Sequence, residues 1–436
     1  MGIDVFARAS AAVAGVKTCQ PMGRISGVSD SMIYAEALPK TARLGDRVTI
    51  HHAGKRTQAE VVRIDSNGVS LLADDPIDGA SIGDPIVLNG SAMFAPDASW
   101  IGRVIDPDGV PLDGYPLLPG LTPKPLRAAA PTAYGRRGLG ARLSSGYMLF
   151  DTVLPITRGQ RIGLFAGSGV GKSTLLAGLA QRMEADIAVI ALVGERGREV
   201  REFVEKTLGP EGLARSIVVA ATSDRGPQIR RRCALAATAI AEHFRDEGQQ
   251  VLLFVDSLTR FAEAHREVAV ASGEPPALRG FPASTAAAIA SLCERAGPAS
   301  GDRGDITAIY SVLVAGSDMD EPVADMVRGV LDGHVVMDRT IAEAGRYPAV
   351  DVLRSVSRSL PDAANPTENA IIAEVRSLMG TYARSELMVR SGLYAAGSDP
   401  TLDRAIAVKD RIDAVFSRMN DAGADAAFAA LKAAIA

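Results

Sequence analysis

Residues 166–174, AGSGVGKST, are the segment whose residue types and spacing most directly imply chemistry. They follow the apolar run RIGLF and precede the helix-like LLAGLAQRM. In a strand–loop–helix of this kind, backbone N–H groups of a glycine-rich turn face a polyphosphate, and the helix directs its N-terminal dipole at the anion. Lys172 is placed to reach the β- and γ-phosphates, and the Ser173 hydroxyl to ligate Mg²⁺. We therefore expect a phosphate-binding loop formed by Ala166, Gly167, Ser168, Gly169, Val170, Gly171, Lys172, Ser173 and Thr174.

The glycines of this loop have a conformational purpose. Gly167, Gly169 and Gly171 allow positive φ angles and a close approach of the backbone to the ligand. Ala166 occupies a first position where the usual pattern has glycine, but that position contributes only backbone. A chance glycine-rich turn is the alternative, and the strand before the loop and the helix after it argue against it.

A phosphate-binding loop also needs an acidic residue that holds the metal through water, at the end of a neighbouring apolar strand. The run VLLFVD supplies Asp256. This carboxylate could instead cap a helix, since Ser-Leu-Thr follows it. Five apolar residues leading directly into the aspartate favour the metal interpretation.

A third candidate group follows the strand-like IAVIALVG, which ends in Glu195 and Arg196. Glu195 could orient the attacking water at the γ-phosphate, and Arg196 could neutralise phosphoryl charge. The alternative is a solvated charge run that caps the next helix. The residues alone leave Glu195 undecided between the two, and they favour the solvated role for Arg198 and Glu199.

These candidates need a scaffold, and the pattern of residues 134–365 supplies one. Near-continuous apolar strands alternate there with helix-like stretches such as CALAATAIAEHFRD, which predicts a parallel sheet covered on both faces. The strands are expected at RIGLFA, IAVIALVG, SIVVAAT, QVLLFVD and ITAIYSVLVA.

Four further regions flank this α/β domain. Residues 20–95 combine short β-branched segments with Gly-Asp turns at 45–46 and 83–84, which predicts a small barrel. Residues 96–133 hold a proline-rich, semi-rigid connection. Residues 366–436 are expected to be helical, with one helix starting at Asp399-Pro400 and carrying Leu402 to Met419 on its apolar face. Residues 1–19 are a tail or a docking helix.

Composition excludes several classes of protein. The 436 residues carry 47 basic and 51 acidic side chains, net charge −4, whereas a dedicated nucleic-acid binder usually has a basic excess. The three cysteines are scattered without metal-ligand spacing, as is typical of a reducing cytoplasm. No apolar run approaches the roughly 18 residues of a membrane span, and acidic and basic residues interrupt the first ten positions as they would not in a signal peptide.

Several segments occur in an order that resembles the rotary-type ATPases, and among them the flagellar and type III protein export ATPases. They are AGSGVGKST, VGERGREVREFVE, ATSD at 221–224, FRDEGQQVLLFVDSLTRFAEAHRE, GEPPALRGFP, and SVLVAGSDMDEPVADMVRGVLDGHVVMDR at 311–339. The last of these, with AAGSDPTLDRAI at 395–406, favours the export branch over synthase subunits. The resemblance covers roughly residues 20–420.

The resemblance implies a fold and a set of site residues. The fold is a β-barrel, a central P-loop (RecA-like) domain and a helical C-terminal domain, with ATP and Mg²⁺ bound. Glu195 matches the catalytic carboxylate and Arg196 the residue facing the γ-phosphate. RYPAVDVLRSVSRSL matches the segment that puts the adenine-stacking aromatic at Tyr347 and an arginine finger at Arg358. Without the resemblance, Tyr347 could equally be a buried ring, and a surface ion pair would be the better interpretation of Arg358.

Two segments depart from the family's pattern. SLPDAANP follows Arg358 where a more apolar helix start is usual, and GFPAS at 280–284 replaces the usual proline pair of the loop that faces a central stalk. The finger's local geometry and the coupling to a stalk are therefore inferred less directly than hydrolysis.

The resemblance also implies partners. We expect a homo-hexameric ring with active sites between subunits, acting with the stalk, regulator and membrane gate proteins of an export apparatus and with export substrates and chaperones. The expected location is the cytoplasm, with peripheral association at the inner-membrane base. A flagellar role is preferred to an injectisome role, and which export substrates are moved stays open.

Three other interpretations remain as alternatives. One is a rotary ATP synthase subunit, although a single chain that holds both the carboxylate and the finger suits a ring of identical subunits. Another is a hexameric RNA translocase, but residues 1–95 hold only three aromatics and nine basic against ten acidic residues, whereas a single-strand groove needs stacking platforms and positive charge. The third, an inactive scaffold, is disfavoured because no catalytic position is missing.

Overall fold

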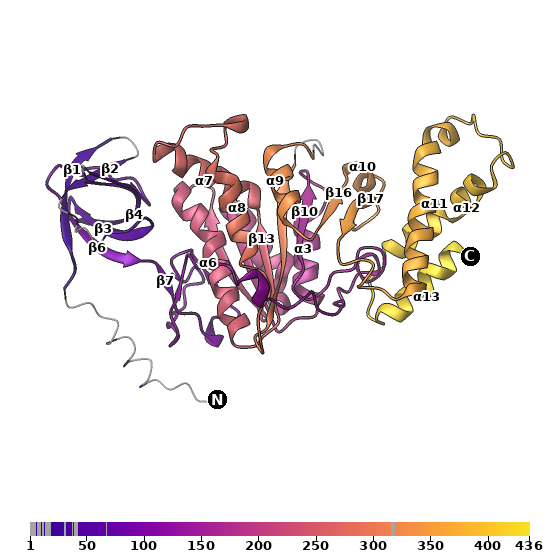
Figure 1. Cartoon of the computed structure of the whole chain (residues 1–436), viewed down its shortest axis with the longest axis horizontal. Helices are drawn as coiled ribbons and strands as arrows, with labels where there is room; N and C mark the ends of the chain where they lie inside the picture. Colours follow the sequence, from indigo (N-terminus) through magenta and orange to yellow (C-terminus); the bar gives the residue numbers. More distant parts are fainter. Residues whose placement is uncertain are drawn as a thin grey trace.

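The computed structural model describes residues 19–29, 32–36, 42–66, 68–314 and 319–436, together with Phe6, Ser10, Val13 and Leu38. The expected tail or docking helix at 1–19 lies almost entirely outside these residues. The described part confirms the expected fold class, with a barrel at one end, a sheet covered by helices in the centre and a helical region at the other end (Figure 1).

The barrel is closed by six strands in the order β1-β2-β5-β4-β3-β6. Alternate side chains point inward, as the period of a strand dictates, and Ile33, Ile50 and Leu71 are fully buried. Gly45 and Gly83 begin two of the turns with φ of 85° and 93°, which requires glycine at both positions. The strands are β1 (Met22–Val28), β2 (Ile33–Glu36), β3 (Asp46–His52), β4 (Lys55–Asp65), β5 (Gly68–Ala73) and β6 (Pro85–Ser91).

The central sheet has the strand order β17-β16-β10-β15-β13-β11-β12-β8, with β14 beside β15. The strands from β16 to β8 run parallel, while β17 and β14 are antiparallel to their neighbours. The strands are β8 (Val104–Ile105), β10 (Arg161–Ala166), β11 (Ile187–Glu195), β12 (Ser216–Thr222), β13 (Val251–Asp256), β14 (Gly297–Pro298), β15 (Asp305–Leu313), β16 (Gly333–Met337) and β17 (Val350–Ser357).

Two hydrophobic cores form on opposite faces of this sheet because successive side chains of each strand point to opposite sides. Leu164 belongs to the core that includes α3 and the C-terminal helices, whereas its neighbour Phe165 belongs to the core that includes α6, α7 and α8. The helices are α3 (Lys172–Arg182), α4 (Gly197–Glu202), α5 (Gly209–Leu213), α6 (Pro227–Asp246), α7 (Leu258–Ala271), α8 (Ser284–Glu294), α9 (Pro322–Val330) and α10 (Arg339–Glu343).

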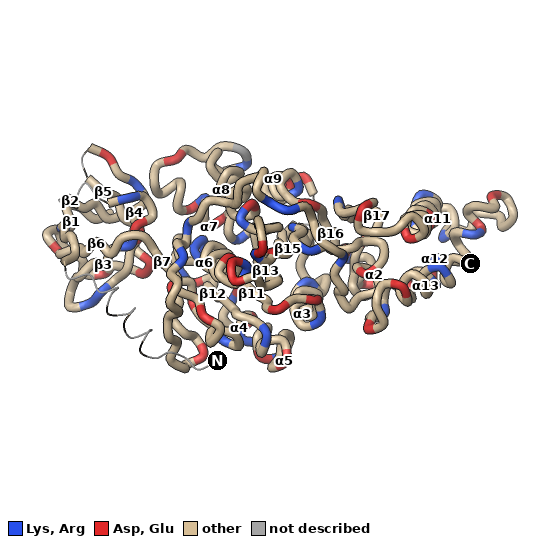
Figure 2. The backbone as a smooth tube through the Cα atoms, turned by 60° about the horizontal axis from the view of Figure 1, so that its bottom comes forward, with Lys and Arg blue, Asp and Glu red and all other residues tan. Residues whose placement is uncertain are grey.

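The connection between barrel and sheet is packed rather than free. Its residues Val104–Ile105 form β8, the edge strand paired with β12, and Trp100 and Leu126 join the core beneath α6. β7 (Met93–Phe94) and β9 (Lys124–Pro125) pair with each other, so the proline-rich segment is tied at both ends. Acidic and basic residues are interspersed along the described part of the chain (Figure 2).

The C-terminal region consists of α11 (Pro366–Arg390), α12 (Pro400–Phe416) and α13 (Ala424–Ile435). Asn365 and Glu368 form a capping box at the start of α11, directly after the SLPDAA segment. Asp399 caps α12 as expected. The expected apolar face is wrong at Met419, which lies beyond the end of the helix and is 40% exposed.

No helix that the structure describes is long and apolar enough to cross a membrane. All three cysteines are free, with Cys233 and Cys293 buried and Cys19 exposed.

Candidate active site

The phosphate-binding loop lies at the carboxyl end of β10. Ala166 is fully buried as the last residue of the strand, and Gly171 begins α3 with φ of 86° and no side-chain cap. The first N–H groups of α3 therefore have no partner from a capping side chain and suit an anion. Gly169 has φ of 78°, and the positive φ that glycine allows is used at Gly169 and Gly171 but not at Gly167. Open space surrounds Gly169, and Ser173 and Thr174 are exposed on the first turn of the helix.

Two carboxylates and a lysine meet at this edge because parallel strands end on the same side of a sheet. Asp256, the last residue of β13, is buried and forms an ion pair with Lys172 from the loop. Ser311 of β15 donates a hydrogen bond to the same carboxylate oxygen over 2.5 Å. Ser311 was not expected from the sequence, although a serine inside the apolar strand ITAIYSVLVA is a signal that could have indicated it.

Glu195 ends the adjacent strand β11 and is half-buried. Burial raises its pKa to about 7, and the neighbouring Asp256 carboxylate adds to this increase while Lys172 opposes it. Glu199 raises the pKa further through a hydrogen bond between the two carboxyl groups. A carboxyl group with a pKa near 7 can accept and return a proton at neutral pH.

Arg196, Glu199 and Arg260 surround Glu195, and they differ in exposure and in hydrogen-bond partners. Arg196 is 80% exposed and pairs with Glu199 over 2.7 Å, so in this structure it points along the helix start rather than toward Lys172. Glu199, for which the sequence favoured only a solvated role, contacts Glu195 as well. Arg260 of α7 lies beside Gly194, and its buried Nε has no hydrogen-bond partner. Sequence reasoning missed Arg260, which lies one helical turn beyond Asp256.

The aromatic residue Tyr347 lies at the same edge of the sheet. A Cβ atom built on Gly171 would be 3.4 Å from Cε1 of the Tyr347 ring, so the ring is beside the phosphate-binding loop. The ring is about half exposed, at 51%, which leaves a face open to a ligand. The alternative of a buried ring is therefore wrong.

Arg358 lies at the other end of the strands, where β10 begins. Its backbone N–H donates to the Asp332 carbonyl, and Asp332 in turn pairs with Arg161 at the start of β10. The full length of β10, about 20 Å at 3.3 Å per residue, therefore separates Arg358 from its own phosphate-binding loop. The side chain is exposed, and no described carboxylate forms an ion pair with it, so the surface ion-pair alternative is not found.

The donor set fits a magnesium nucleotide better than a metal held by protein alone. No group of three His, Cys, Asp or Glu side chains in the described residues could hold a metal ion. Mg²⁺ is commonly bound by one or two protein oxygens together with phosphates and water. The Ser173 hydroxyl and the Asp256 carboxylate are the oxygens of this kind at the loop.

The chain is similar to known proteins over most of its length. Residues 146–357 match the ATP synthase alpha/beta family, nucleotide-binding domain, and residues 364–432 match the T3SS EscN ATPase C-terminal domain. A flagellum-specific ATP synthase of Caulobacter vibrioides is 42% identical over 417 residues, which cover 93% of this chain and 94% of that protein. A type 3 secretion system ATPase of Sinorhizobium fredii is 42% identical over 388 residues, covering 88% and 85%.

The solved structures include the assembled ATPase EscN from the type III secretion system of enteropathogenic E. coli. It matches with a TM-score of 0.86 at 38% identity, over 95% of this chain and 100% of that chain. A second structure, of EscN in complex with its central stalk EscO, matches with a TM-score of 0.85. The fold, the loop and these similarities show that the chain is a P-loop ATPase and belongs to the family of flagellum-specific ATP synthases and type III secretion ATPases.

Proposed function

We propose that this chain hydrolyses ATP in a homo-hexameric ring whose active sites lie between subunits, and that the ring energises protein export through a type III apparatus. The observation that carries the proposal is the placement of Tyr347 and Arg358 at opposite ends of the strands of one sheet. Tyr347 lies beside the phosphate-binding loop at the end of β10, and Arg358 lies near the start of β10. A single subunit then offers two complementary halves of a site, and identical subunits arranged head to tail close into a ring.

In the first half-site, the loop 166–174 holds the phosphates and Lys172 neutralises charge on the β- and γ-phosphates. Lys172 forms an ion pair with Asp256 in this structure, so nucleotide binding replaces one anionic partner with another. Ser173, and Asp256 through water, would hold Mg²⁺, which supplies charge neutralisation on the phosphate oxygens when bound. Tyr347 stacks against the adenine, which an aromatic face can do without base-specific hydrogen bonds.

Glu195 is the residue that orients the attacking water. Its pKa near 7 supports this role because a base with a pKa close to the working pH balances availability against proton affinity. Arg196 is exposed and free to rotate toward the γ-phosphate once its contact with Glu199 breaks.

The second half-site is Arg358, acting on the nucleotide of the neighbouring subunit. An arginine finger supplied in trans contributes about 10³ to 10⁵ in rate in analogous phosphoryl-transfer enzymes. The separation of Arg358 from its own loop by the length of β10 supports action in trans.

A mixing experiment tests this proposal. Lys172→Ala and Arg358→Ala should each be nearly inactive alone, and a mixture should regain up to about a quarter of wild-type turnover through interfaces that carry both intact residues. Specific activity should also fall on dilution to monomers. Constant specific activity in a strictly monomeric sample would contradict the shared site, and no recovery at any mixing ratio would contradict action in trans.

The partners that we propose are a central stalk, a regulator, a membrane gate, and export substrates with their chaperones, at the cytoplasmic side of the membrane base. The stalk is supported by the EscN complex with EscO. A flagellar role is supported by the relative from Caulobacter, and an injectisome role by the one from Sinorhizobium. Deleting the gene and scoring both filaments and secreted effectors separates them, since loss of filaments alone supports the flagellar role and loss of effectors alone overturns it.

A further inference from the structure

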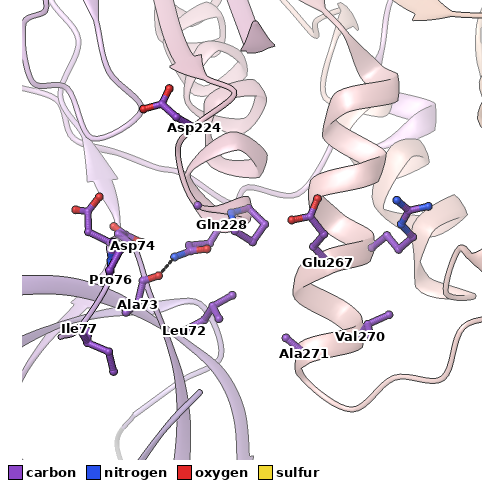
Figure 3. A pocket seen from close by; sticks show the side chains of 14 residues that line it. Leu72, Ala73, Asp74, Pro76, Ile77, Asp224, Gln228, Glu267, Val270 and Ala271 are labelled. Atoms are coloured by element: carbon purple, nitrogen blue, oxygen red, sulfur yellow. Dashed lines mark hydrogen bonds between the residues drawn. The ribbon is translucent and has the colours of Figure 1, made fainter. Parts of the chain in front are cut away.

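Hollows of opposite charge lie where the barrel meets the ATPase domain. The larger, of about 750 Å³, is lined by β5, α6 and α7 and contains several carboxylates (Figure 3). Arginines already compensate these acids, as in the pairs Asp74–Arg232 and Glu267–Arg230. The smaller, of about 190 Å³, lies among α6, α7, α8 and the connection that follows the barrel. We call this smaller one the arginine hollow, and its charges are not balanced in the same way.

The charged residues that line the arginine hollow are all basic. They are Arg127, Arg231 and Arg295, and none of the described residues that line the hollow is acidic. Arg295 is fully paired, because its guanidinium donates to both carboxylate oxygens of Glu242 and to the Leu126 carbonyl. The donors that a ligand could use therefore belong to Arg127 and Arg231.

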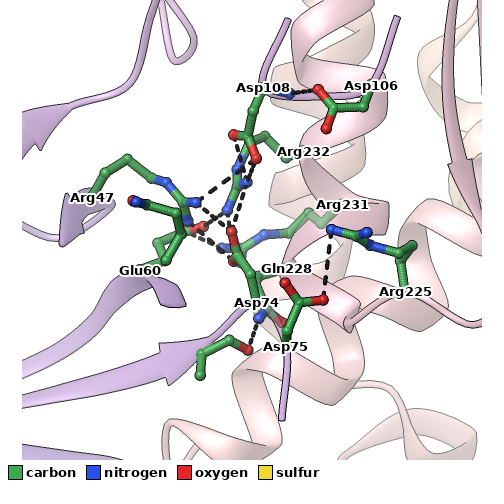
Figure 4. Close-up of polar contacts among 12 residues, drawn as sticks. Arg47, Glu60, Asp74, Asp75, Asp106, Asp108, Arg225, Gln228, Arg231 and Arg232 are labelled. Atoms are coloured by element: carbon green, nitrogen blue, oxygen red, sulfur yellow. Dashed lines mark hydrogen bonds and ion pairs between the residues drawn. The ribbon is translucent and has the colours of Figure 1, made fainter. Parts of the chain in front are cut away.

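Arg127 and Arg231 share a single carboxylate oxygen. Each donates a hydrogen bond to Oε1 of Glu60 over 2.7 Å. The other oxygen of Glu60 lies 3.6 Å from Arg232, which has two aspartates of its own (Figure 4). One carboxylate thus serves two arginines that have no other acidic partner among the described residues, and this leaves positive charge in excess at the hollow.

Arg231 has unused hydrogen-bond donors although it is nearly buried. Its side chain is 11% exposed, and its contact with Glu60 is the one hydrogen bond that its five N–H groups make within the described part of the chain. Nε and Nη1 of Arg231 therefore lack partners, and unlike Nε of Arg232 they are not sealed from solvent. Burial lowers the pKa of Arg231, and Arg127 and Arg232 lower it further while Glu60 opposes them. An anion beside Arg231 would correct this incomplete compensation of a desolvated cation.

His265 also lines the arginine hollow and is neutral there. The Ser284 hydroxyl donates its one hydrogen to Glu274 over 2.6 Å, so Nε2 of His265 must donate to Ser284 over 2.8 Å, and Nδ1 carries no hydrogen. Burial lowers the pKa of His265 to about 4, and Arg231 and Arg127 add to this decrease while Glu274 opposes it. The ring is therefore a local reporter of the charge in the hollow.

We propose that the arginine hollow binds a free tetrahedral oxyanion of the size of inorganic phosphate. Guanidinium groups match phosphate oxygens in a bidentate geometry, and the Ser291 hydroxyl on the same wall adds a donor. The volume of about 190 Å³ has room for such an ion with water, at about 30 Å³ for each water molecule. It is smaller than the roughly 300–1,000 Å³ of pockets for larger organic ligands. The bound ion would join Arg127 of the connection to Arg231 of α6, and no residue of the phosphate-binding loop lines the hollow.

Titration of inorganic phosphate into the full chain tests the site, with ¹⁵N-labelled histidine and with sodium chloride holding the ionic strength constant. The ring nitrogens of His265, assigned with His265→Gln, should show a saturable shift, and the pKa of His265 should rise because an anion favours the charged ring. Acetate, which is planar and carries one charge, should bind at least about tenfold more weakly. Lys172→Ala removes the charge of the phosphate-binding loop and should leave the response of His265 to phosphate in place, which separates the two phosphate sites.

Two variants probe the donors. Arg127→Gln should weaken phosphate binding at His265 about tenfold, because a charge-assisted hydrogen bond is lost. Arg231→Gln should abolish the saturable shift, with folding checked by its melting transition. Arg404→Gln is the matched control, since Arg404 is 49% exposed against 50% for Arg127, also pairs with a glutamate, and lies outside the hollow. The proposal is overturned if His265 shows no saturable shift, if acetate binds as tightly as phosphate, if Lys172→Ala removes the shift, or if Arg127→Gln and Arg404→Gln behave alike.

Discussion

Replacing Glu199 with Gln should move the pH dependence of ATP hydrolysis to lower pH without changing the rate at high pH. The Glu199 side chain is partly exposed, at 42%, and its carboxylate accepts a hydrogen bond from the protonated form of Glu195, which raises the pKa of Glu195. A glutamine side chain carries no charge and can donate a hydrogen bond to the Glu195 carboxylate, which favours the ionised form. The change also releases Arg196 from its 2.7 Å contact with Glu199, and this cation acts in the same direction.

The magnitude follows from the groups that surround Glu195. Its pKa is raised from 4.5 to about 7, first by burial and then by Asp256, and neither changes in this variant. Because the Glu199 side chain is 42% exposed, its share should be at most about one pKa unit, so the pKa of Glu195 should fall to no lower than about 6. With a drop of a full pKa unit, the ionised fraction of Glu195 at pH 6 rises from about a tenth to about a half, so kcat/KM at pH 6 should increase by up to about fivefold, with almost no change at pH 8.

The pH profile of kcat/KM for Mg·ATP from pH 5.5 to 8.5 measures this shift, because kcat/KM reports ionisations of the free enzyme. Ionisation of the substrate contributes equally to both enzymes, so the difference between the two profiles reports the protein. Glu205→Gln is the matched control, because Glu205 pairs with exposed Arg201 in the same segment and is not among the groups that shift the pKa of Glu195. A midpoint that stays in place or rises in Glu199→Gln would refute the reasoning, as would a wild-type profile that is flat below pH 7.

Three further predictions concern other parts of the molecule. Tyr347→Ala should raise KM for ATP about tenfold with kcat largely kept, and Tyr347→Phe should stay close to wild type in the same kinetics, because stacking needs the ring and not the hydroxyl. Gly178→Ala should lower the free energy of unfolding by about 1–3 kcal/mol, because the new Cβ would lie 2.0 Å from the Tyr147 hydroxyl oxygen. Urea titrations measure this change, and unchanged stability would mean that the Tyr147 ring moves aside. Arg232→Met should cost up to about 3–5 kcal/mol, because it removes one of the two arginines, Arg232 and Arg47, that compensate buried Asp74. A smaller loss in Arg232→Met with Asp74→Asn would identify the poorly compensated charge as the cause.

Local sequence patterns predicted most of the elements of the fold. The apolar runs that predict buried parallel strands are found as β10, β11, β12, β13 and β15, since such runs can bury their side chains only in a sheet covered on both faces. Glycine-rich turns likewise predicted the closed barrel. The short strands β8, β16 and β17 were not expected, because two to eight residues with mixed polarity carry little periodic signal.

The sequence by itself determined which chemistry is available. A strand, GSGVGKST and a helix predict a phosphate-binding loop wherever they occur, because the N–H groups and the lysine that bind phosphate are neighbours in the chain. Asp256 could be found in the same way, from the apolar run that leads into it.

Tertiary structure decided how the remaining groups are used. The raised pKa of Glu195 depends on burial and on Asp256, 61 positions along the chain but in the adjacent strand. Tyr347 precedes β17 and Arg358 follows it. Because β17 runs antiparallel beside β16, Tyr347 lies next to Gly171 at the carboxyl ends of the parallel strands, and Arg358 lies at their amino ends. Electrostatic and packing energies depend on distances in space, and a linear sequence does not contain those distances until the chain has folded.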